Sequence, residues 1–394
     1  MKNIVGGIPR GDNFFPRDKV IQKIYRRLDS GDNVYMAAPR RVGKTAIMYR
    51  LQDKPEIGYY FIYIITESIE DTESFFKELL RQLLKSDAFN KLIKISKKTG
   101  ELFRKIKSVN LGELGFELNE SDINYFEDFR NLLQKLETHD FKIILMVDEF
   151  PQTVENIFRK SGKDAAQNFL QANRVVRQEA NKNILFIITG SIGLHTLAEK
   201  LNATKEINDL NTVDIKPLDR VEAKELTTSL LNSYDIPIEQ GSIDYLLDKI
   251  QWFVPFYIQL AVQEIIDEYE NTEQTINNKS VSEAFSRITN RRNNHFFEHY
   301  YSRLAKTFKD NEYTFALELL HELTQHDEFS ISLVDKLAHR HNLDKIYPII
   351  LRTLTFDGYI YSRQKKDEIY YCFTSPILRN WWRKYVIDMH NSQD

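Results

Sequence analysis

The segment that most constrains the fold is Ala38–Thr45, which reads Ala-Pro-Arg-Arg-Val-Gly-Lys-Thr. It follows a short apolar run, Asn33–Ala37, and precedes a helical stretch, Thr45–Leu51. A loop with this spacing turns successive backbone N–H groups inward around phosphate groups, and the helix that follows adds the positive end of its dipole. Ala38 stands where such loops usually begin with glycine, and it lacks the freedom of glycine at positive φ. The segment predicts a phosphate-binding loop between a buried strand and a helix.

The residue types at the end of this loop suit ATP and its magnesium ion. The side chain of Lys44 is placed to reach the β- and γ-phosphates, and the hydroxyl of Thr45 is a ligand for Mg²⁺. Chance matches to so short a pattern are common, but here a strand precedes the loop and a helix follows it. The sequence therefore predicts ATP and Mg²⁺ as cofactors, with the nucleotide contacted by Pro39, Arg40, Arg41, Val42, Gly43, Lys44, Thr45 and Ala46.

Two later strands end in polar residues that would complete this site. The apolar run Ile143–Val147 is followed by Asp148 and Glu149. We expect Asp148 to hold the magnesium ion through water and Glu149 to act as the general base on the attacking water. The run Ile184–Thr189 leads to Ser191, whose hydroxyl either senses the γ-phosphate or is an ordinary polar strand end. The predicted catalytic residues are Glu149, Lys44 and Ser191.

The apolar runs of the first half are continuous rather than alternating, which is typical of parallel strands buried on both faces. The predicted strands are Asn33–Ala37, Tyr60–Ile65, Ile143–Val147, Ile184–Thr189 and Thr212–Ile215. Helical patterns lie between them, at Ser74–Leu84, Tyr125–Leu136 and Asp164–Ala180. Strands alternating with helices indicate an α/β fold with an open parallel sheet.

After about residue 216 the strand patterns stop. Amphipathic helices are predicted at Val221–Tyr234, Ser242–Ile250, Phe256–Tyr269 and Ser280–Ile288. Helices at Glu312–Leu323, Ser332–His341 and Asp344–Phe356 then precede two short strands, Tyr359–Ser362 and Ile369–Phe373, a layout typical of a winged helix-turn-helix. We expect a core over residues 1–217 with a basic insertion at about 88–122, a helical lid over 218–290 and a winged-helix domain over 291–394.

Charge and cysteine content narrow the class of protein. The 54 Lys and Arg against 57 Asp and Glu give a net charge of −3, so the chain as a whole has no bulk attraction to nucleic acid or anionic membrane. Its single cysteine, Cys372, excludes an internal disulfide framework and a thiolate zinc site. No apolar run reaches the length of a signal peptide core or a membrane span. These features predict a cytoplasmic protein without membrane contact.

With these motifs the chain resembles the archaeal-type ATPases of the signal-transduction (STAND) class, which are relatives of AAA+ proteins. The resemblance rests on Phe14–Asp18, Pro39–Thr45, Val147–Phe150, Thr189–Ser191 and Phe373–Trp382. It implies that Phe15 and Arg17 cup the base and ribose, and that Pro255 of the lid approaches the nucleotide. The chain departs from the family where Pro16 replaces a glycine and where Trp252-Phe253-Val254-Pro255 replaces Gly-Gly-X-Pro.

Arginine is scarce where ring-forming AAA+ proteins carry a trans-acting finger and a lid sensor. Between Gln178 and Ser286 the only arginine is Arg220. The nearby candidates for a guanidinium on the transferred phosphate are Arg40, Arg41, Arg174 and Arg177, of which we expect Arg174 and Arg177 to be surface residues. A slow, switch-like ATPase is therefore favoured over a processive ring motor.

Two functions are compatible with the sequence. In the first, the nucleotide state controls a protein partner, an effector or self-association, and the resemblance implies a role in signalling or antiviral defence. In the second, the winged helix or the basic insertion, with seven Lys and Arg over Lys91–Lys107, binds DNA. Residues 311–394 carry ten Lys and Arg against twelve Asp and Glu, and the expected recognition helix, Asp344–Phe356, is mostly apolar apart from Lys345 and Arg352. Because a DNA reader presents a basic face, we interpret that helix as a packing element and favour the first function.

Overall fold

The computed structural model describes residues 1–95, 124–136, 141–190 and 193–387. They form two units. The core unit comprises Pro16–Ala38 and Lys44–Ile215, and the C-terminal unit comprises Met1–Phe15, Pro39–Gly43 and Lys216–Asp394. The predicted basic insertion falls largely on residues 96–123, which lie outside the described residues.

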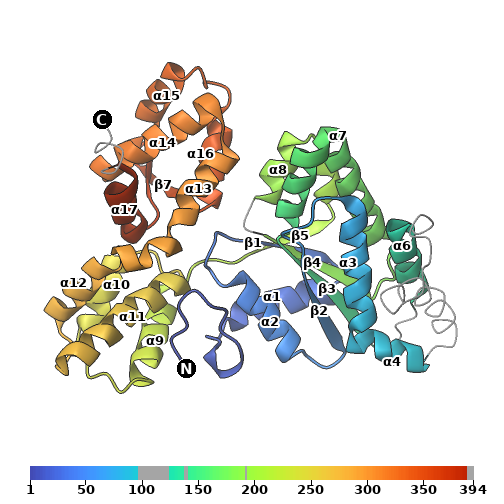
Figure 1. The fold of residues 1–394 in the computed structure, drawn as a ribbon, viewed down its shortest axis with the longest axis horizontal. Coiled ribbons are helices and arrows are strands. Elements are labelled where there is room, and N and C mark those ends of the chain that lie inside the picture. The colour runs from blue at the N-terminus through green and yellow to red at the C-terminus, as the bar shows by residue number, and fades with distance from the viewer. Residues whose placement is uncertain (96–123, 137–140, 191–192, 388–394) are drawn as a thin grey trace. The chain divides into compact units, whose positions relative to one another are not determined.

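The core unit is an α/β structure with a parallel sheet of five strands (Figure 1). The strands are β1 (Asn33–Ala37), β2 (Tyr59–Ile65), β3 (Lys142–Asp148), β4 (Ile184–Thr189) and β5 (Leu210–Asp214), in the order β2-β3-β4-β1-β5. All five predicted strands are present, each within two residues of its expected start. The helices are α1 (Asp18–Asp29), α2 (Lys44–Asp53), α3 (Thr72–Lys85), α4 (Asp87–Ile95), α6 (Tyr125–Lys135), α7 (Phe150–Glu179) and α8 (Leu194–Lys200). Helix α7 is broken at Gly162, whose φ of 86° is not helical.

The register of the sheet brings the polar strand ends together. Ile65 of β2 lies opposite Asp148 of β3, and Met36 of β1 lies opposite Thr189 of β4. Because the strands are parallel, the residues that follow β1, β3 and β4 emerge at one edge of the sheet. Ligands of open α/β sheets bind at this carboxyl edge.

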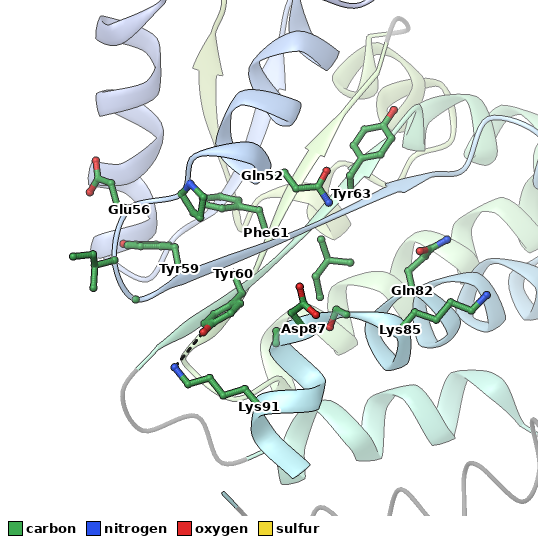
Figure 2. A pocket seen from close by; sticks show the side chains of 16 residues that line it. Gln52, Glu56, Tyr59, Tyr60, Phe61, Tyr63, Gln82, Lys85, Asp87 and Lys91 are labelled. Atoms are coloured by element: carbon green, nitrogen blue, oxygen red, sulfur yellow. Dashed lines mark hydrogen bonds between the residues drawn. The ribbon is translucent and has the colours of Figure 1, made fainter. Parts of the chain in front are cut away.

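Strand β2 forms one side of the sheet and pairs only with β3 within the described residues. A cleft of about 710 Å³ runs along it (Figure 2). Its walls come from β2, the loop that leads into it and the ends of α3 and α4. Tyr59, Tyr60 and Tyr63 line the cleft from the strand.

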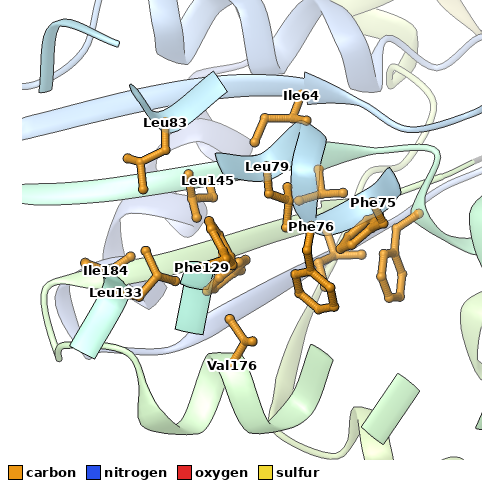
Figure 3. Close-up of a cluster of buried hydrophobic side chains, with 14 of the residues drawn as sticks. Ile64, Phe75, Phe76, Leu79, Leu83, Phe129, Leu133, Leu145, Val176 and Ile184 are labelled. Carbon is orange, nitrogen blue, oxygen red and sulfur yellow. The ribbon is translucent and has the colours of Figure 1, made fainter. Parts of the chain in front are cut away.

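A large apolar cluster fixes the sheet against the helices on one face. Figure 3 shows Phe75, Phe76 and Leu79 of α3 packing with Phe129 of α6 and with side chains of the strands. Each fully buried side chain of this size contributes about 1.5–3 kcal/mol relative to an exposed one. The rings of Phe75 and Phe169 pack edge to face, with their centroids 4.9 Å apart. This packing holds β3, and therefore the residues that follow it, in a fixed position.

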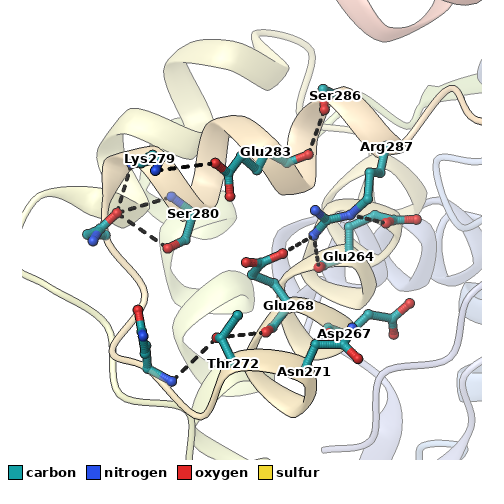
Figure 4. A network of polar contacts seen from close by, with 12 residues as sticks. Glu264, Asp267, Glu268, Asn271, Thr272, Lys279, Ser280, Glu283, Ser286 and Arg287 are labelled. Atoms are coloured by element: carbon teal, nitrogen blue, oxygen red, sulfur yellow. Dashed lines mark hydrogen bonds and ion pairs between the residues drawn. The ribbon is translucent and has the colours of Figure 1, made fainter.

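The C-terminal unit begins with four helices, α9 (Arg220–Asn232), α10 (Ser242–Ile250), α11 (Pro255–Thr272) and α12 (Asn278–Arg287). A buried carboxylate joins the last two (Figure 4). Glu264 of α11 accepts hydrogen bonds from Arg287 at 3.4 Å and from Asn293 at 2.8 Å, and it also pairs with Arg292. Burying a charged group is costly unless it is paired and hydrogen-bonded, as Glu264 is here. The network therefore fixes the path of the chain from α12 into the following segment.

The rest of the unit combines helices with a small antiparallel sheet. The helices are α13 (Glu298–Thr307), α14 (Asp310–Gln325), α15 (Ile331–Arg340), α16 (Tyr347–Phe356) and α17 (Pro376–Trp382), and the strands β6 (Phe329–Ser330), β7 (Ile360–Lys365) and β8 (Glu368–Phe373) pair in the order β6-β8-β7. Trp382 is fully buried against Tyr359 and Phe373. None of the helices in the described ranges is long and apolar enough to cross a membrane.

Helix α16 differs in two ways from the sequence-based expectation. It begins at Tyr347 rather than at Asp344, with Pro348 in its first turn, where a missing N–H has no cost. Ile350, Leu351 and Leu354 are buried, but Ile346 and Ile349 are 41% and 38% exposed. The interpretation of this segment as a packing helix is therefore correct for one face only.

Candidate active site

The loop after β1 has the backbone that a phosphate-binding loop requires. Helix α2 begins at Lys44, and the buried Lys44 Nζ donates a hydrogen bond of 2.9 Å to the carbonyl oxygen of Ala38. The positive φ angles lie at Arg41 (66°) and Gly43 (98°), whereas Ala38 is not among the residues with positive φ. Alanine at the first loop position is therefore compatible with the turn, and the glycine that the turn needs is Gly43.

Asp148 is the centre of the polar contacts at this edge of the sheet. Its Oδ2 accepts hydrogen bonds from Thr45 Oγ1 at 3.1 Å and from Tyr63 Oη at 2.8 Å, and its Oδ1 accepts one from the Glu149 backbone N–H at 3.0 Å. Asp148 is only 3% exposed. Burial and the nearby charge of Glu149 raise the pKa of the Asp148 carboxyl, and the hydrogen bonds from Tyr63 and Thr45 and the charge of Lys44 oppose that rise.

The donor set at Asp148 fits a magnesium ion held jointly with a nucleotide. Thr45 and Asp148 supply hard oxygen atoms that are already within hydrogen-bond distance of each other. The described part of the chain has no group of three or more His, Cys, Asp or Glu side chains that could hold a metal by themselves. Magnesium at nucleotide sites needs no such group, because one or two protein ligands, water and the phosphates complete its shell.

Glu149 occupies an unusual backbone conformation. With φ 58° and ψ 30° it is left-handed, and it immediately precedes α7. Such a conformation costs of order 1 kcal/mol in a residue other than glycine, and strain of this kind concentrates at functional sites. A Cβ atom built on Gly190 would lie 3.6 Å from Glu149 Oε2 and only 2.5 Å from Pro151 Cδ. The glycine after β4 thus leaves room for the start of α7 and for the Glu149 side chain.

Two buried threonines fix the end of β3. Thr66 donates to the carbonyl oxygen of Asp148 from its backbone N–H at 3.1 Å and from Oγ1 at 3.0 Å. Thr153 Oγ1 in turn donates to the Thr66 carbonyl oxygen at 2.7 Å. Sequence reasoning missed Thr66 and Tyr63. Tyr63 lies on β2 and Thr66 directly follows it, and their contacts depend on the pairing of β2 with β3, for which the sequence carries no signal.

The remaining predicted residues are placed differently. Ser191 lies outside the described residues. The hydroxyl of Thr189, the last residue of β4, is fully buried and donates to the Met36 carbonyl oxygen at 3.3 Å, so it faces β1 rather than a ligand. Arg17 is buried in the core unit just before α1. Phe15 and Pro255 belong to the C-terminal unit, where Pro255 begins α11.

Three of the four candidate arginines, Arg41, Arg174 and Arg177, make contacts with other side chains of the protein. Arg177 is buried and makes a two-pronged ion pair with Asp209, at 2.7 and 2.8 Å, so the expectation that it is a surface residue was wrong. It lies on α7 opposite the loop before β5, which supplies the acid. Arg174 is partly exposed and lies 3.6 Å from Glu206. Within the C-terminal unit, the guanidinium of Arg41 lies over the ring of Phe256, 4.5 Å from its centroid.

Comparisons with known proteins identify the family of the chain and structures of similar fold. Residues 14–250 match the family described as the ATPase domain predominantly from Archaea. No curated protein matches the chain. Among solved structures, the Walker-type ATPase PABY2304 of Pyrococcus abyssi is similar in fold, with 15% identity, a TM-score of 0.65 and coverage of 97% of this chain and 100% of that one. The ORC2 protein of Aeropyrum pernix, in ADPNP and ADP complexes, is similar with 12% identity, a TM-score of 0.54 and 98% coverage of both chains.

Proposed function

This chain belongs to the family of ATPase domains found predominantly in Archaea, and from that premise we propose that it is a slow, magnesium-dependent ATP switch of the signal-transduction class that controls a protein partner. Membership of this family assigns the chain to the P-loop ATPases as a general class. The metal dependence, the slow rate, the class and the partner are the proposal. The observation that carries it is the convergence of Thr45 and Tyr63 on Asp148, directly beside the left-handed Glu149.

Each residue of the carboxyl edge has a separate task in the proposed hydrolysis. The ammonium group of Lys44 binds the β- and γ-phosphates, for which it exchanges its present bond to the Ala38 carbonyl oxygen. Thr45 and Asp148 would hold magnesium, which neutralises charge on the phosphates. Glu149 accepts a proton of the water whose oxygen attacks the γ-phosphorus, and the bond from that phosphorus to the β–γ bridging oxygen breaks, which gives inorganic phosphate and ADP.

Glu149→Gln tests the division between binding and hydrolysis. The amide keeps the shape of the side chain but does not accept a proton, so we expect Mg-ATP to bind normally while single-turnover hydrolysis slows by about 10²–10⁴-fold. Calorimetry gives the affinity, and rapid quench of radiolabelled ATP gives the rate. Hydrolysis at the wild-type rate would place the general base on another residue.

The switch part of the proposal assigns residues 218–290 to a helical lid and 291–394 to a winged helix. The pairing of β6, β8 and β7 beside α14, α15 and α16 supports the second assignment, and the resemblance to signal-transduction ATPases suggests a role in signalling or antiviral defence. If nucleotide state controls this part, hydrogen exchange of residues 216–387 should differ between Glu149→Gln with ATP and the wild type with ADP. Equal exchange in the two states would contradict the switch.

The alternative, a DNA-binding ATPase, is less well supported by the charges of the C-terminal unit. A winged helix binds DNA through cations on its hairpin and recognition helix. Here Glu328 holds both cations of β7, with Lys365 at 2.7 Å and Arg363 in a second ion pair. Arg379 is likewise paired with Asp327 at 2.5 Å. The three cations of the hairpin, Arg363, Lys365 and Lys366, are thus balanced by the charges of Glu328, Asp367 and Glu368.

A salt series distinguishes the two functions. DNA affinity falls by about 0.9 log units per phosphate contact for each log unit of salt. We expect weak binding in fluorescence anisotropy that disappears near physiological ionic strength and does not change in Lys345→Ala or Arg352→Ala. Tight, salt-resistant binding that depends on either residue, or ATPase activity that rises strongly with DNA, would favour the alternative.

A further inference from the structure

A tyrosine of the neighbouring strand reaches the carboxylate of the candidate metal site. Tyr63 lies opposite Met146 in the sheet, whereas Asp148 lies two residues further along β3. Two residues of a strand span roughly 6–7 Å, a distance that the side chain of tyrosine covers. Its hydroxyl donates to Asp148 Oδ2 at 2.8 Å, and its ring packs against Tyr49 of α2 with centroids 4.7 Å apart.

The hydrogen bond from Tyr63 differs in kind from the one that Thr45 makes to the same oxygen. Thr45 is itself a proposed magnesium ligand, so its hydroxyl serves the metal and the carboxylate together. Tyr63 comes from a different strand, does not belong to the phosphate-binding loop, and has no proposed ligand of its own. It therefore restrains the Asp148 carboxylate from outside the metal site.

We propose that Tyr63 is a positioning residue that orients Asp148 for magnesium through the hydrogen bond from its hydroxyl to Oδ2. This inference rests on the proposed function of the same site. Residues that orient metal ligands in this way typically change metal affinity by about 10–100-fold when they are replaced. The hydroxyl forms the hydrogen bond to Asp148 and the ring packs against Tyr49, so a substitution that removes only the hydroxyl separates the two contributions.

Tyr63→Phe removes the hydroxyl and keeps the ring against Tyr49. The measurement is ATP affinity by calorimetry, once in excess magnesium and once in EDTA, with the thermal midpoint of each variant recorded. We expect the magnesium-dependent gain in ATP affinity to fall by about tenfold, while the affinity in EDTA and the thermal midpoint stay at the wild-type values.

Tyr59→Phe is the matched control. Tyr59 lies on the same strand, four residues away and on the same face, and its hydroxyl also bonds to an aspartate, Asp29. That aspartate is outside the candidate site, so the control removes a similar hydrogen bond without touching Asp148. We expect its magnesium-dependent gain to equal that of the wild type.

The second test is a double substitution. In an Asp148→Asn background the carboxylate is already lost, so Tyr63→Phe should cause no further change in the magnesium-dependent gain. An equal effect of Tyr63→Phe in both backgrounds, or a loss of ATP affinity that is the same in EDTA, would show a merely structural role and overturn the proposal. If the wild type binds ATP equally with and without magnesium, the proposed metal-dependent function itself fails, which is a separate result.

Discussion

Arg177 offers a sharp test of whether a buried arginine of the core unit is structural or catalytic. Its side chain is 2% exposed and donates to Asp209 from Nε and from its terminal nitrogen, and also to the Glu206 carbonyl oxygen at 2.8 Å. Arg177→Met keeps the aliphatic part of the side chain and removes the charge and all three hydrogen bonds. Asp209 is then left without its main partner.

The expected destabilisation follows from the exposure of the two partners. Breaking a buried ion pair by removing one member costs about 3–5 kcal/mol. Because the Asp209 side chain is 16% exposed and regains some hydration, we expect the lower end, about 3 kcal/mol of unfolding free energy. In a domain of about 150–250 residues, each kcal/mol of destabilisation lowers the thermal midpoint by about 2–4 °C. The midpoint of Arg177→Met should therefore fall by roughly 6–12 °C.

Arg174→Met is the control within the same helix. Its nearest acid, Glu206, is 3.6 Å away and Arg174 is 26% exposed, so we expect a loss below about 1 kcal/mol. ATPase activity of all three proteins is measured well below their thermal midpoints. A structural Arg177 leaves the activity within a few-fold of wild type, whereas a guanidinium acting on the transferred phosphate is worth about 10³–10⁵ in rate. An unchanged midpoint, or a thousandfold loss of activity in the folded variant, would refute the reasoning.

Two other predictions concern the loop and the C-terminal unit. Lys44→Ala should largely abolish ATP binding in a calorimetric titration, since no other cation is fixed by the loop spacing on the β- and γ-phosphates, and wild-type affinity would contradict the assignment. Burial, and the positive charges of neighbouring arginines including Arg303, lower the pKa of His299 from 6.5 to about 3. As the pH falls below 6.5, the unfolded chain binds a proton at this histidine before the folded chain does. The free energy of unfolding is therefore lower by about 2 kcal/mol at pH 5. In urea unfolding at pH 7.5 and pH 5, the stability lost between the two pH values should be about 2 kcal/mol smaller in His299→Gln than in the wild type, and an equal loss in both proteins would contradict this role of His299.

The positions of the strands were predictable because their apolar runs are continuous. The expected and observed bounds of β4, Ile184–Thr189, are identical. Strand β3 extends by one residue at each end, to Lys142 and Asp148, since polar residues pair in a ladder without leaving a hydrophobic signal. Because the strands were expected to be parallel, the loop and the acidic strand end were also expected at one edge of the sheet, where Thr45 and Asp148 meet.

The contacts that depend on distant pairing were not predictable. Tyr63 sits in the run Tyr-Tyr-Phe-Ile-Tyr-Ile-Ile, in which nothing distinguishes one tyrosine from another. Its bond to Asp148 follows from the register between β2 and β3, which the local sequence does not contain. Arg177 was misjudged for the same reason, because an arginine is exposed by default and its acid, Asp209, lies 32 residues further along the chain.

The close approach of Gly190 to the start of α7 restricts how this sequence can change. A methyl group at position 190 would collide with Pro151, whose Cδ and Cγ lie 2.5 and 2.9 Å from the place of the new Cβ. Pro151 is buried in the first turn of its helix, and its ring is closed onto the backbone, so it cannot rotate aside as a flexible side chain would. A larger residue at 190 is therefore admissible only after position 151 has lost its ring. If both positions are to change, Pro151 must therefore be replaced before Gly190, in evolution as in directed selection.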